Sequence, residues 1–156
     1  MLKKRMKMVL PVVLLVSVVF ALQTFPHCQI PCGIYNDETQ FDIMNTHVTS
    51  LEKGMNQIKE LSAAGDKNYN QIVRWVENKD QTADDLSHIV TYYFLTQRIK
   101  PVEDKNSAAY KDYTAKLEML HQMLIASMKC KQTTDLENVE ILKDLLKQFK
   151  EAYFAK

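Results

Sequence analysis

Residues 41–58, Phe-Asp-Ile-Met-Asn-Thr-His-Val-Thr-Ser-Leu-Glu-Lys-Gly-Met-Asn-Gln-Ile, decide the fold of this chain. Their apolar side chains recur at steps of three and four, at Phe41, Met44, Val48, Leu51, Met55 and Ile58. Such steps place side chains on one face of an α-helix. Asp37 or Thr39 is suited to cap the start of this helix, and Gly65 is suited to end it. The stretch therefore predicts an amphipathic helix that buries one face.

The rest of the chain continues this helical pattern. A second helical stretch runs from about residue 67 to 97, and its polar run at 77–82 would break or bend it. Its predicted buried face comprises Ile72, Trp75, Val76, Ala83, Leu86, Val90, Tyr93 and Phe94. A third helix follows Ser107, with a predicted buried face at Tyr110, Tyr113, Leu117, Leu120 and Leu124. A fourth, capped by Thr133, Thr134 or Asp135, carries Leu136, Val139, Leu142, Leu146, Phe149 and Tyr153.

The composition favours helices over a turn-rich β fold, because the 156 residues include only 3 Gly and 4 Pro. All four prolines fall outside the predicted helices, whose interiors a proline would disrupt. Gly54 lies inside the first helix and costs it about 1 kcal/mol relative to Ala. Four helices with short connections and one apolar face each predict an all-α fold, an antiparallel up-down four-helix bundle over residues 37–156.

Residues 1–26 have a different character and read as a leader. Four basic residues, Lys3, Lys4, Arg5 and Lys7, precede an apolar stretch from Met8 to Leu22. That stretch is shorter than the roughly 20 apolar residues of a membrane-spanning helix. A basic start and a short apolar run are typical of a secretory signal, and cleavage after Ala21 would suit a signal peptidase. We therefore expect an exported protein, periplasmic or secreted; the alternative is a membrane anchor formed by an uncleaved leader.

Removal of the leader changes the charge of the chain. The full chain has a formal net charge of +1, and without residues 1–26 it keeps 16 basic and 19 acidic residues, a net charge of −3. A mildly acidic chain gives no reason to expect binding to nucleic acid or to an anionic membrane.

The nine residues after the leader, 27–35, read His-Cys-Gln-Ile-Pro-Cys-Gly-Ile-Tyr and carry the candidate chemistry. A cut before His27 would place an α-amine, an imidazole, a backbone nitrogen and two thiols within six residues. A signal peptidase cut after Ala21 would need a second trimming; a dedicated protease could instead cut at Pro26–His27. Thiolate and nitrogen donors in one plane suit Ni(II) or Cu(II). Zinc fits less well, because no second ligand pair at zinc-finger spacing follows.

Cys28 and Cys32 have other uses that stay open at this point. In an exported protein they could form a disulfide or a redox-active dithiol. A disulfide across three residues closes a very small loop, which stabilises a fold little by loop entropy, and it leaves His27 and Tyr35 without a role. The alternative function is then a membrane-anchored or exported helical binding module with a Cys28–Cys32 disulfide.

The pattern His27-Cys28-x-x-Pro31-Cys32-Gly33-x-Tyr35 resembles the active-site hook of the nickel-containing superoxide dismutases, and matches it at six of nine positions. The resemblance implies residues 27–36 as a metal hook, freed by a leader-processing protease, ahead of a helical bundle at 37–156. It implies a homohexamer that disproportionates superoxide to oxygen and hydrogen peroxide by cycling between Ni(II) and Ni(III). Any contact with a membrane would run only through an uncleaved leader.

The resemblance also implies the ligand set, with one nickel ion per subunit. The ligands would be the His27 α-amine, the Cys28 backbone nitrogen and the Cys28 and Cys32 sulfurs, with the His27 imidazole as axial ligand. Tyr35 would stand by the open face of the metal, where it orders water and limits access.

The chain departs from the family pattern at three places. Gln29 replaces the acidic residue that many members carry after the first cysteine. Some members orient the imidazole with a Glu on the first helix and an Arg on the second. At those places this chain has Ile43, with Asp42 beside it, and Asn78, with Lys79 beside it. Cys130 is expected to be an unpaired thiol near a helix end, with pairing between molecules left open.

Overall fold

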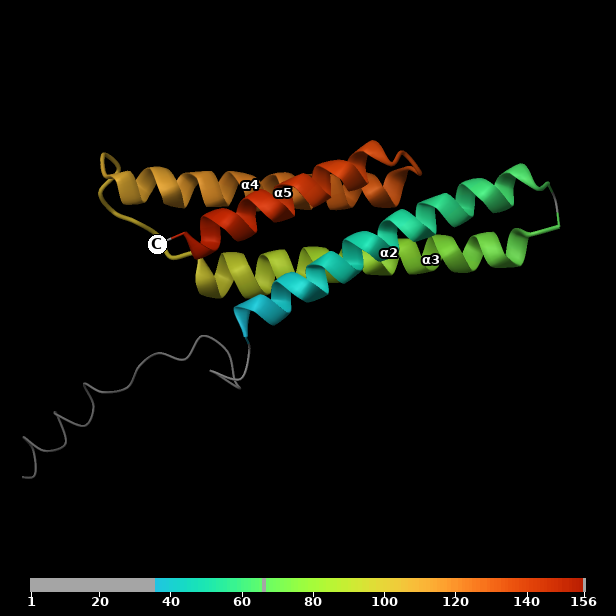
Figure 1. The fold of residues 1–156 in the computed structure, drawn as a ribbon, viewed down its shortest axis with the longest axis horizontal. Coiled ribbons are helices and arrows are strands. Elements are labelled where there is room, and N and C mark those ends of the chain that lie inside the picture. The colour runs from blue at the N-terminus through green and yellow to red at the C-terminus, as the bar shows by residue number, and fades with distance from the viewer. Residues whose placement is uncertain (1–35, 66, 156) are drawn as a thin grey trace, which may run out of the picture. The chain divides into compact units, whose positions relative to one another are not determined.

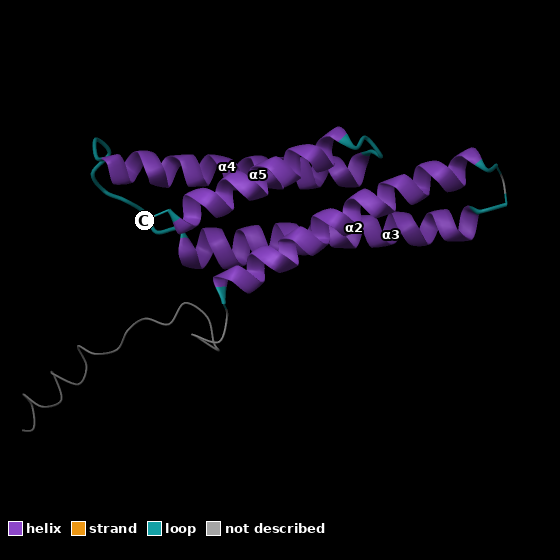
Figure 2. Cartoon of the chain, viewed as in Figure 1, coloured by secondary structure: helices purple, strands orange, loops and turns teal. Residues whose placement is uncertain are grey.

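The structure is a computed structural model, and it describes residues 36–65 and 67–155. Over these residues it is all-helical and contains no strand, which confirms the predicted all-α class. The helices are α2 (Asp37–Ala63), α3 (Tyr69–His88), the π-helix η1 (Ile89–Arg98), α4 (Ala108–Gln132) and α5 (Glu137–Phe154). Figures 1 and 2 show them as two hairpins, one of α2 and α3 and one of α4 and α5.

Each helix packs against its neighbour in sequence, and α5 packs back against α2. The ion pairs give the directions of the helices. Asp37 at the start of α2 pairs with Arg98 at the end of η1, and Glu38 pairs with Lys150 near the end of α5. Neighbouring helices therefore run in opposite directions, and the described residues form a helical bundle with the predicted order.

Three helix termini follow local sequence signals. The Asn36 side chain accepts a 2.8 Å hydrogen bond from the backbone N–H of Glu38. The cap of α2 is therefore one residue before Asp37 and three before Thr39, the two predicted caps. Helix α4 follows Ser107 as predicted, and the Ser107 hydroxyl caps it by accepting from the N–H of Tyr110 at 3.1 Å. Gly65 follows α2 with a φ of 80°, a conformation that favours glycine.

The start of α5 was predicted one to three residues too early. The helix begins at Glu137 after Leu136, whose side chain makes no capping hydrogen bond. Thr133 and Asp135 form a preceding turn, in which their side chains accept from the N–H groups of Asp135 and Glu137. Short polar side chains fit such a turn as well as a cap, and the sequence alone did not separate the two uses.

The predicted apolar faces contribute most of the core. On the third helix, however, the predicted Tyr110, Tyr113, Leu117 and Leu124 are only partly buried, and Leu120 is completely buried. Every apolar residue named for the first helix is buried, and Phe41, Met44, Leu51 and Met55 are completely so. The prediction was wrong for Val76, which is 37% exposed, while Ile72 and Trp75 are only partly buried. This part of α3 lies where the α2–α3 hairpin extends past the α4–α5 turn, so that α3 has fewer helices to pack against (Figure 1).

The second helical stretch was expected to break or bend at its polar run 77–82. Instead α3 continues through this run to His88, and the change comes at Ile89, where the π-helix η1 begins. Its wider turn is visible in bonds between residues five apart, such as Ile99 N–H to Phe94 C=O at 3.0 Å. Among the described residues, no helix is both long and apolar enough to cross a membrane.

Candidate metal centre

The predicted site residues His27, Cys28, Cys32 and Tyr35 lie outside the described residues. Their donor set, two thiols with an amine and an imidazole, fits nickel by its chemistry. Within residues 36–65 and 67–155, no three His, Cys, Asp or Glu side chains come together in a way that could hold a metal ion. The hook is joined directly to the described residues, because Asn36 follows Tyr35 in the chain.

A polar cluster surrounds Asp37 in the first turn of α2. One carboxylate oxygen, Oδ1, accepts from Arg98 Nε at 2.8 Å and from the hydroxyl of Tyr93. The other, Oδ2, accepts from the hydroxyl of Tyr153 at 2.9 Å. Arg98 Nη2 also donates to the Tyr93 hydroxyl oxygen at 2.8 Å. Through these bonds the Asp37 side chain connects α2 with both η1 and α5.

The π-helix accounts for the position of Arg98. In a π-helix, hydrogen bonds join residues five apart, so such residues lie about one turn from each other. Tyr93 and Arg98 have this separation. The Arg98 guanidinium carbon lies 4.7 Å from the centroid of the Tyr93 ring, which is within cation–π range. Both side chains therefore reach the same carboxylate.

Aromatic rings pack beneath this cluster. The ring of Phe41, one turn after Asp37, lies 5.0 Å from that of Phe94, 5.5 Å from that of Phe149 and 5.6 Å from that of Tyr153. Phe41, Phe94 and Phe149 are completely buried, whereas the Asp37 side chain is 30% exposed. The carboxylate thus lies between solvent and a closed apolar layer.

This surrounding shifts the pKa values of the cluster. Burial acts to raise the pKa of Asp37, but the hydrogen bonds from Tyr93 and Tyr153 and the charge of Arg98 outweigh it, so the pKa lies below its usual value. Burial and the bond to Asp37 raise the pKa of both tyrosines. The Tyr93 hydroxyl and Asp37 raise the pKa of Arg98. Asp37 is therefore an ionised acceptor at neutral pH.

A second polar group is buried elsewhere in the bundle. Lys79 on α3 is 3% exposed, and its Nζ donates to the carbonyl oxygens of Cys130 at 2.8 Å and Lys131 at 2.6 Å. It also donates to Asp80 Oδ1 at 2.7 Å. These carbonyls belong to the last turn of α4, which lacks partners within its own helix, so Lys79 caps that helix from the side.

The sequence model of the family described as nickel-containing superoxide dismutase matches residues 21–156, which include the hook and the whole bundle. The chain belongs to this family. It is therefore a superoxide dismutase, an oxidoreductase with a nickel cofactor and superoxide as its substrate. Comparisons with curated protein sequences and with solved structures give no match. Family membership does not favour the alternative of a helical binding module.

Two of the departures from the family pattern can be located in the bundle of this dismutase. Ile43, at the place of the expected Glu, is 38% exposed, and Asp42 beside it is also exposed. Asn78, at the place of the expected Arg, is exposed. The ammonium of Lys79 donates hydrogen bonds to backbone carbonyls at the end of α4. These residues therefore do not supply a Glu–Arg pair like the one expected for the family.

Sequence reasoning missed the Asp37 cluster of the dismutase. It assigned Asp37 to a helix cap and Tyr93 and Tyr153 to apolar faces, and it gave Arg98 no role. A usable signal was present: the start of the first helix must lie beside the end of the second in an antiparallel pair. An acidic residue at 37 and a basic one at 98 then face each other.

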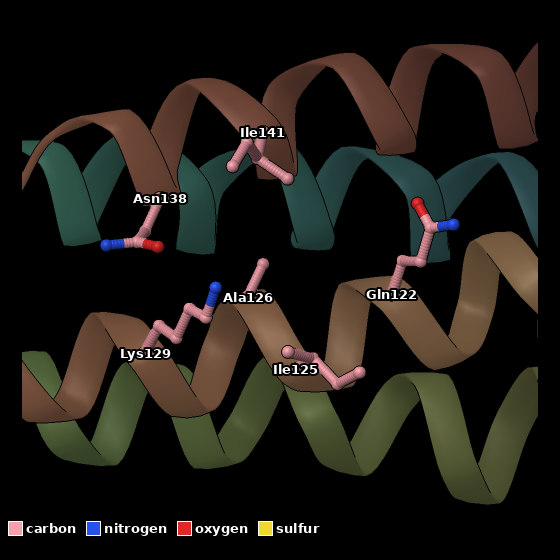
Figure 3. Close-up of a pocket in the computed structure, with 6 residues that line it drawn as sticks. All are labelled: Gln122, Ile125, Ala126, Lys129, Asn138 and Ile141. Carbon is pink, nitrogen blue, oxygen red and sulfur yellow. The ribbon is translucent and has the colours of Figure 1, made fainter.

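The described residues also contain pockets and three histidines. A pocket of about 170 Å³ lies between α4 and α5, lined by Gln122, Ile125, Ala126, Lys129, Asn138 and Ile141 (Figure 3). His88 is exposed and stacks on Tyr92 at 4.3 Å, and His121 is also exposed. Burial lowers the pKa of the half-buried His47, against the opposing charge of Asp85.

Proposed function

We propose that this superoxide dismutase acts through residues 27–36 as its nickel hook, after export and removal of residues 1–26. The observation that carries the proposal is the family match over residues 21–156, because the matched segment contains the whole donor set of the hook. A chain that kept its leader would lack the α-amine of His27, and so one of the proposed ligands.

Three residues would hold one nickel ion per subunit. His27 contributes its α-amine and its imidazole, Cys28 its backbone nitrogen and sulfur, and Cys32 its sulfur. When bound, nickel supplies one-electron chemistry between Ni(II) and Ni(III), by which one superoxide is oxidised to oxygen and another is reduced to hydrogen peroxide. The thiolates and the deprotonated amide are electron-rich donors, and such donors stabilise the higher oxidation state.

The remaining hook residues control access and protons. Each hydrogen peroxide formed takes up two protons, and we assign Tyr35 to ordering the water that delivers them and to limiting the size of molecules that enter. The net charge of −3 after leader removal provides no strong attractive field for an anionic substrate. The rate at which superoxide reaches the hook then depends more on access to the hook than on long-range electrostatic steering.

Export, processing and assembly complete the proposal. The basic and apolar pattern of residues 1–26 supports export to the periplasm or the medium, followed by a protease that exposes His27. A homohexamer is supported by large apolar side chains that the described bundle leaves exposed, among them Tyr69 at 63%, Val73 at 53% and Met128 at 50%. Assembly of copies would cover such side chains.

The test uses protein purified from its native host and compares three single variants with the wild type. The N-terminal residue, the nickel content and the dismutase activity are measured on each sample. We expect a wild-type chain that starts at His27 with about one nickel per subunit. Cys28→Ser and Cys32→Ser should lose nickel and activity together, because each loses a ligand.

Cys130→Ala is the matched control, since Cys130 is fully buried in α4 and unpaired. This variant should keep its nickel and its activity per folded molecule. Activity retained by Cys28→Ser or Cys32→Ser, or a wild-type chain that keeps its leader and binds no nickel, would overturn the proposed hook.

A further inference from the structure

The Asp37 carboxylate is held more firmly than a helix start requires. The cap of α2 is already provided by Asn36, and the aromatic layer of Phe41, Phe94 and Phe149 already joins α2 to η1 and α5. In addition, both oxygens of Asp37 accept hydrogen bonds, from donors on two other helices. Bonds from a charged donor, and bonds to a charged acceptor, are stronger than neutral ones and more demanding in geometry.

These bonds, together with the packing below, hold the first turn of α2 from three sides. Arg98 and Tyr93 hold Asp37 from η1, and Tyr153 holds it from α5. The aromatic rings below prevent the first turn of α2 from moving inward, since Phe41 is completely buried. The first turn of α2 is thus held by hydrogen bonds from two helices and by packing from below.

This first turn lies close to the hook along the chain. Asp37 follows Tyr35 by two residues and Cys32 by five. Five residues of fully extended chain span at most about 18 Å. The length of the chain therefore keeps Cys32 within about 18 Å of Asp37.

We propose that Asp37, held by Arg98 and Tyr153, is a positioning residue for the nickel hook of this dismutase. The inference rests on the proposed function of residues 27–36. The cluster keeps the residue that follows the hook, Asp37, in one place. Less conformational entropy is then lost when the ligands bind the metal. A fixed Asp37 therefore raises nickel affinity and keeps the ligand field uniform, because preorganisation lowers the cost of binding.

The experiment compares the processed wild-type protein with Asp37→Asn, Arg98→Lys and Tyr153→Phe. Nickel affinity is measured by competition with a chelator, and the oxidised nickel is characterised by electron paramagnetic resonance. We expect Asp37→Asn to weaken nickel binding about tenfold, the lower end for residues that support metal ligands. Its spectrum should become heterogeneous. A further variant, Arg98→Met, removes the charge and should lose nickel affinity. Arg98→Lys keeps the charge, so it should keep most of the affinity that Arg98→Met loses.

Lys143→Met is the matched control. Lys143 on α5 also bonds to α2, at 2.9 Å to Glu52, but far along the helix from Asp37. Its loss should leave nickel affinity and spectrum unchanged. Tyr153→Phe removes a single hydrogen bond and keeps the ring, so it carries the test if Asp37→Asn fails to fold.

The outcomes separate the two proposals. Wild-type protein that binds no nickel would overturn the proposed function and this inference with it. Wild-type protein that binds nickel, with Asp37→Asn and Tyr153→Phe within twofold of it and identical in spectrum, would overturn only the positioning role. A loss of affinity in Asp37→Asn equal to that in Lys143→Met would also overturn it, since general destabilisation would then explain both.

Discussion

Two charged side chains, Asp37 and Lys79, each hold helices together, but in different ways. Asp37 is 30% exposed and is bound by side chains of η1 and α5, whereas Lys79 is 3% exposed and binds backbone carbonyls of α4. Each has three partners. Lys79 completes the end of a helix, and Asp37 fixes the start of one. We propose that the same number of hydrogen bonds serves the fold at Lys79 and the hook at Asp37.

The two sites are far enough apart to be changed independently. Lys79 lies opposite Gly54, since a Cβ at Gly54 would be 3.6 Å from that of Lys79. Residues 37 to 54 of α2 span about 25 Å at 1.5 Å per residue. Substitutions at such a separation usually add in their effects on stability. We therefore expect Lys79 variants to lose stability without losing nickel, and Asp37 variants to lose mainly nickel.

The largest effect is expected for Lys79→Met. The methionine keeps the length of the side chain but leaves the carbonyls of Cys130 and Lys131 without their donor. We expect the free energy of unfolding to fall by about 2–3 kcal/mol, as for buried hydrogen bonds to a charged group. Urea unfolding measures this, and nickel content per folded molecule should not change. A loss below about 0.5 kcal/mol, or a parallel loss of nickel, would remove the contrast between the sites.

A smaller effect is expected from pH at Asp37. Because the folded state lowers the pKa of Asp37, its contribution to stability is complete above the unfolded carboxyl pKa of about 3.9. It is lost as the pH falls through the lower, folded-state pKa. The stabilities of wild type and Asp37→Asn should therefore differ above pH 4 and converge towards pH 2. Unfolding curves across this range provide the measurement, and a constant difference would contradict the assignment.

The smallest effect is expected for Gly54→Ala, beside Lys79. The new Cβ would lie 3.6 Å from Lys79 Cβ and 3.9 Å from Trp75, which are ordinary contacts. Because alanine restricts the unfolded chain and favours a helix, stability should rise by about 0.5–1 kcal/mol. Thermal unfolding would detect this gain, and nickel affinity should stay the same. A destabilised Gly54→Ala protein would mean that the Lys79 region is packed more tightly than these contacts indicate.

Local patterns in the sequence predicted most of the fold. The steps of three and four from Phe41 to Ile58 identified a buried helix face, and Ser107 and Gly65 marked helix ends, because each signal lies within a few residues. The π-helix was missed, although Val90, Phe94 and Ile99 are spaced by four and five residues. Only the step of five is unusual for an α-helix, and one such step is easily read as a helix end.

The two charged sites could not be predicted in this way. Lys79 lies in a polar run, and nothing near it in the sequence indicates that it is buried, since its partners are backbone carbonyls some fifty residues later. Asp37 and Arg98 lie 61 residues apart. By contrast, the candidate hook was visible in the sequence because its donors fall within residues 27–32. The family match supports nickel and superoxide, while the individual ligands stay a prediction.

The burial of Cys130 affects the order in which the cysteines of the enzyme are oxidised. Cys130 is the one cysteine outside the hook, it is completely buried, and burial raises its pKa to about 11. Peroxides attack the thiolate, so a buried protonated thiol reacts slowly with the hydrogen peroxide that a superoxide dismutase releases. Oxidation of cysteine by hydrogen peroxide should then begin at Cys28 and Cys32. If Cys28 and Cys32 hold the nickel as proposed, their oxidation would release the metal while the bundle stays folded, and inactivation would precede unfolding.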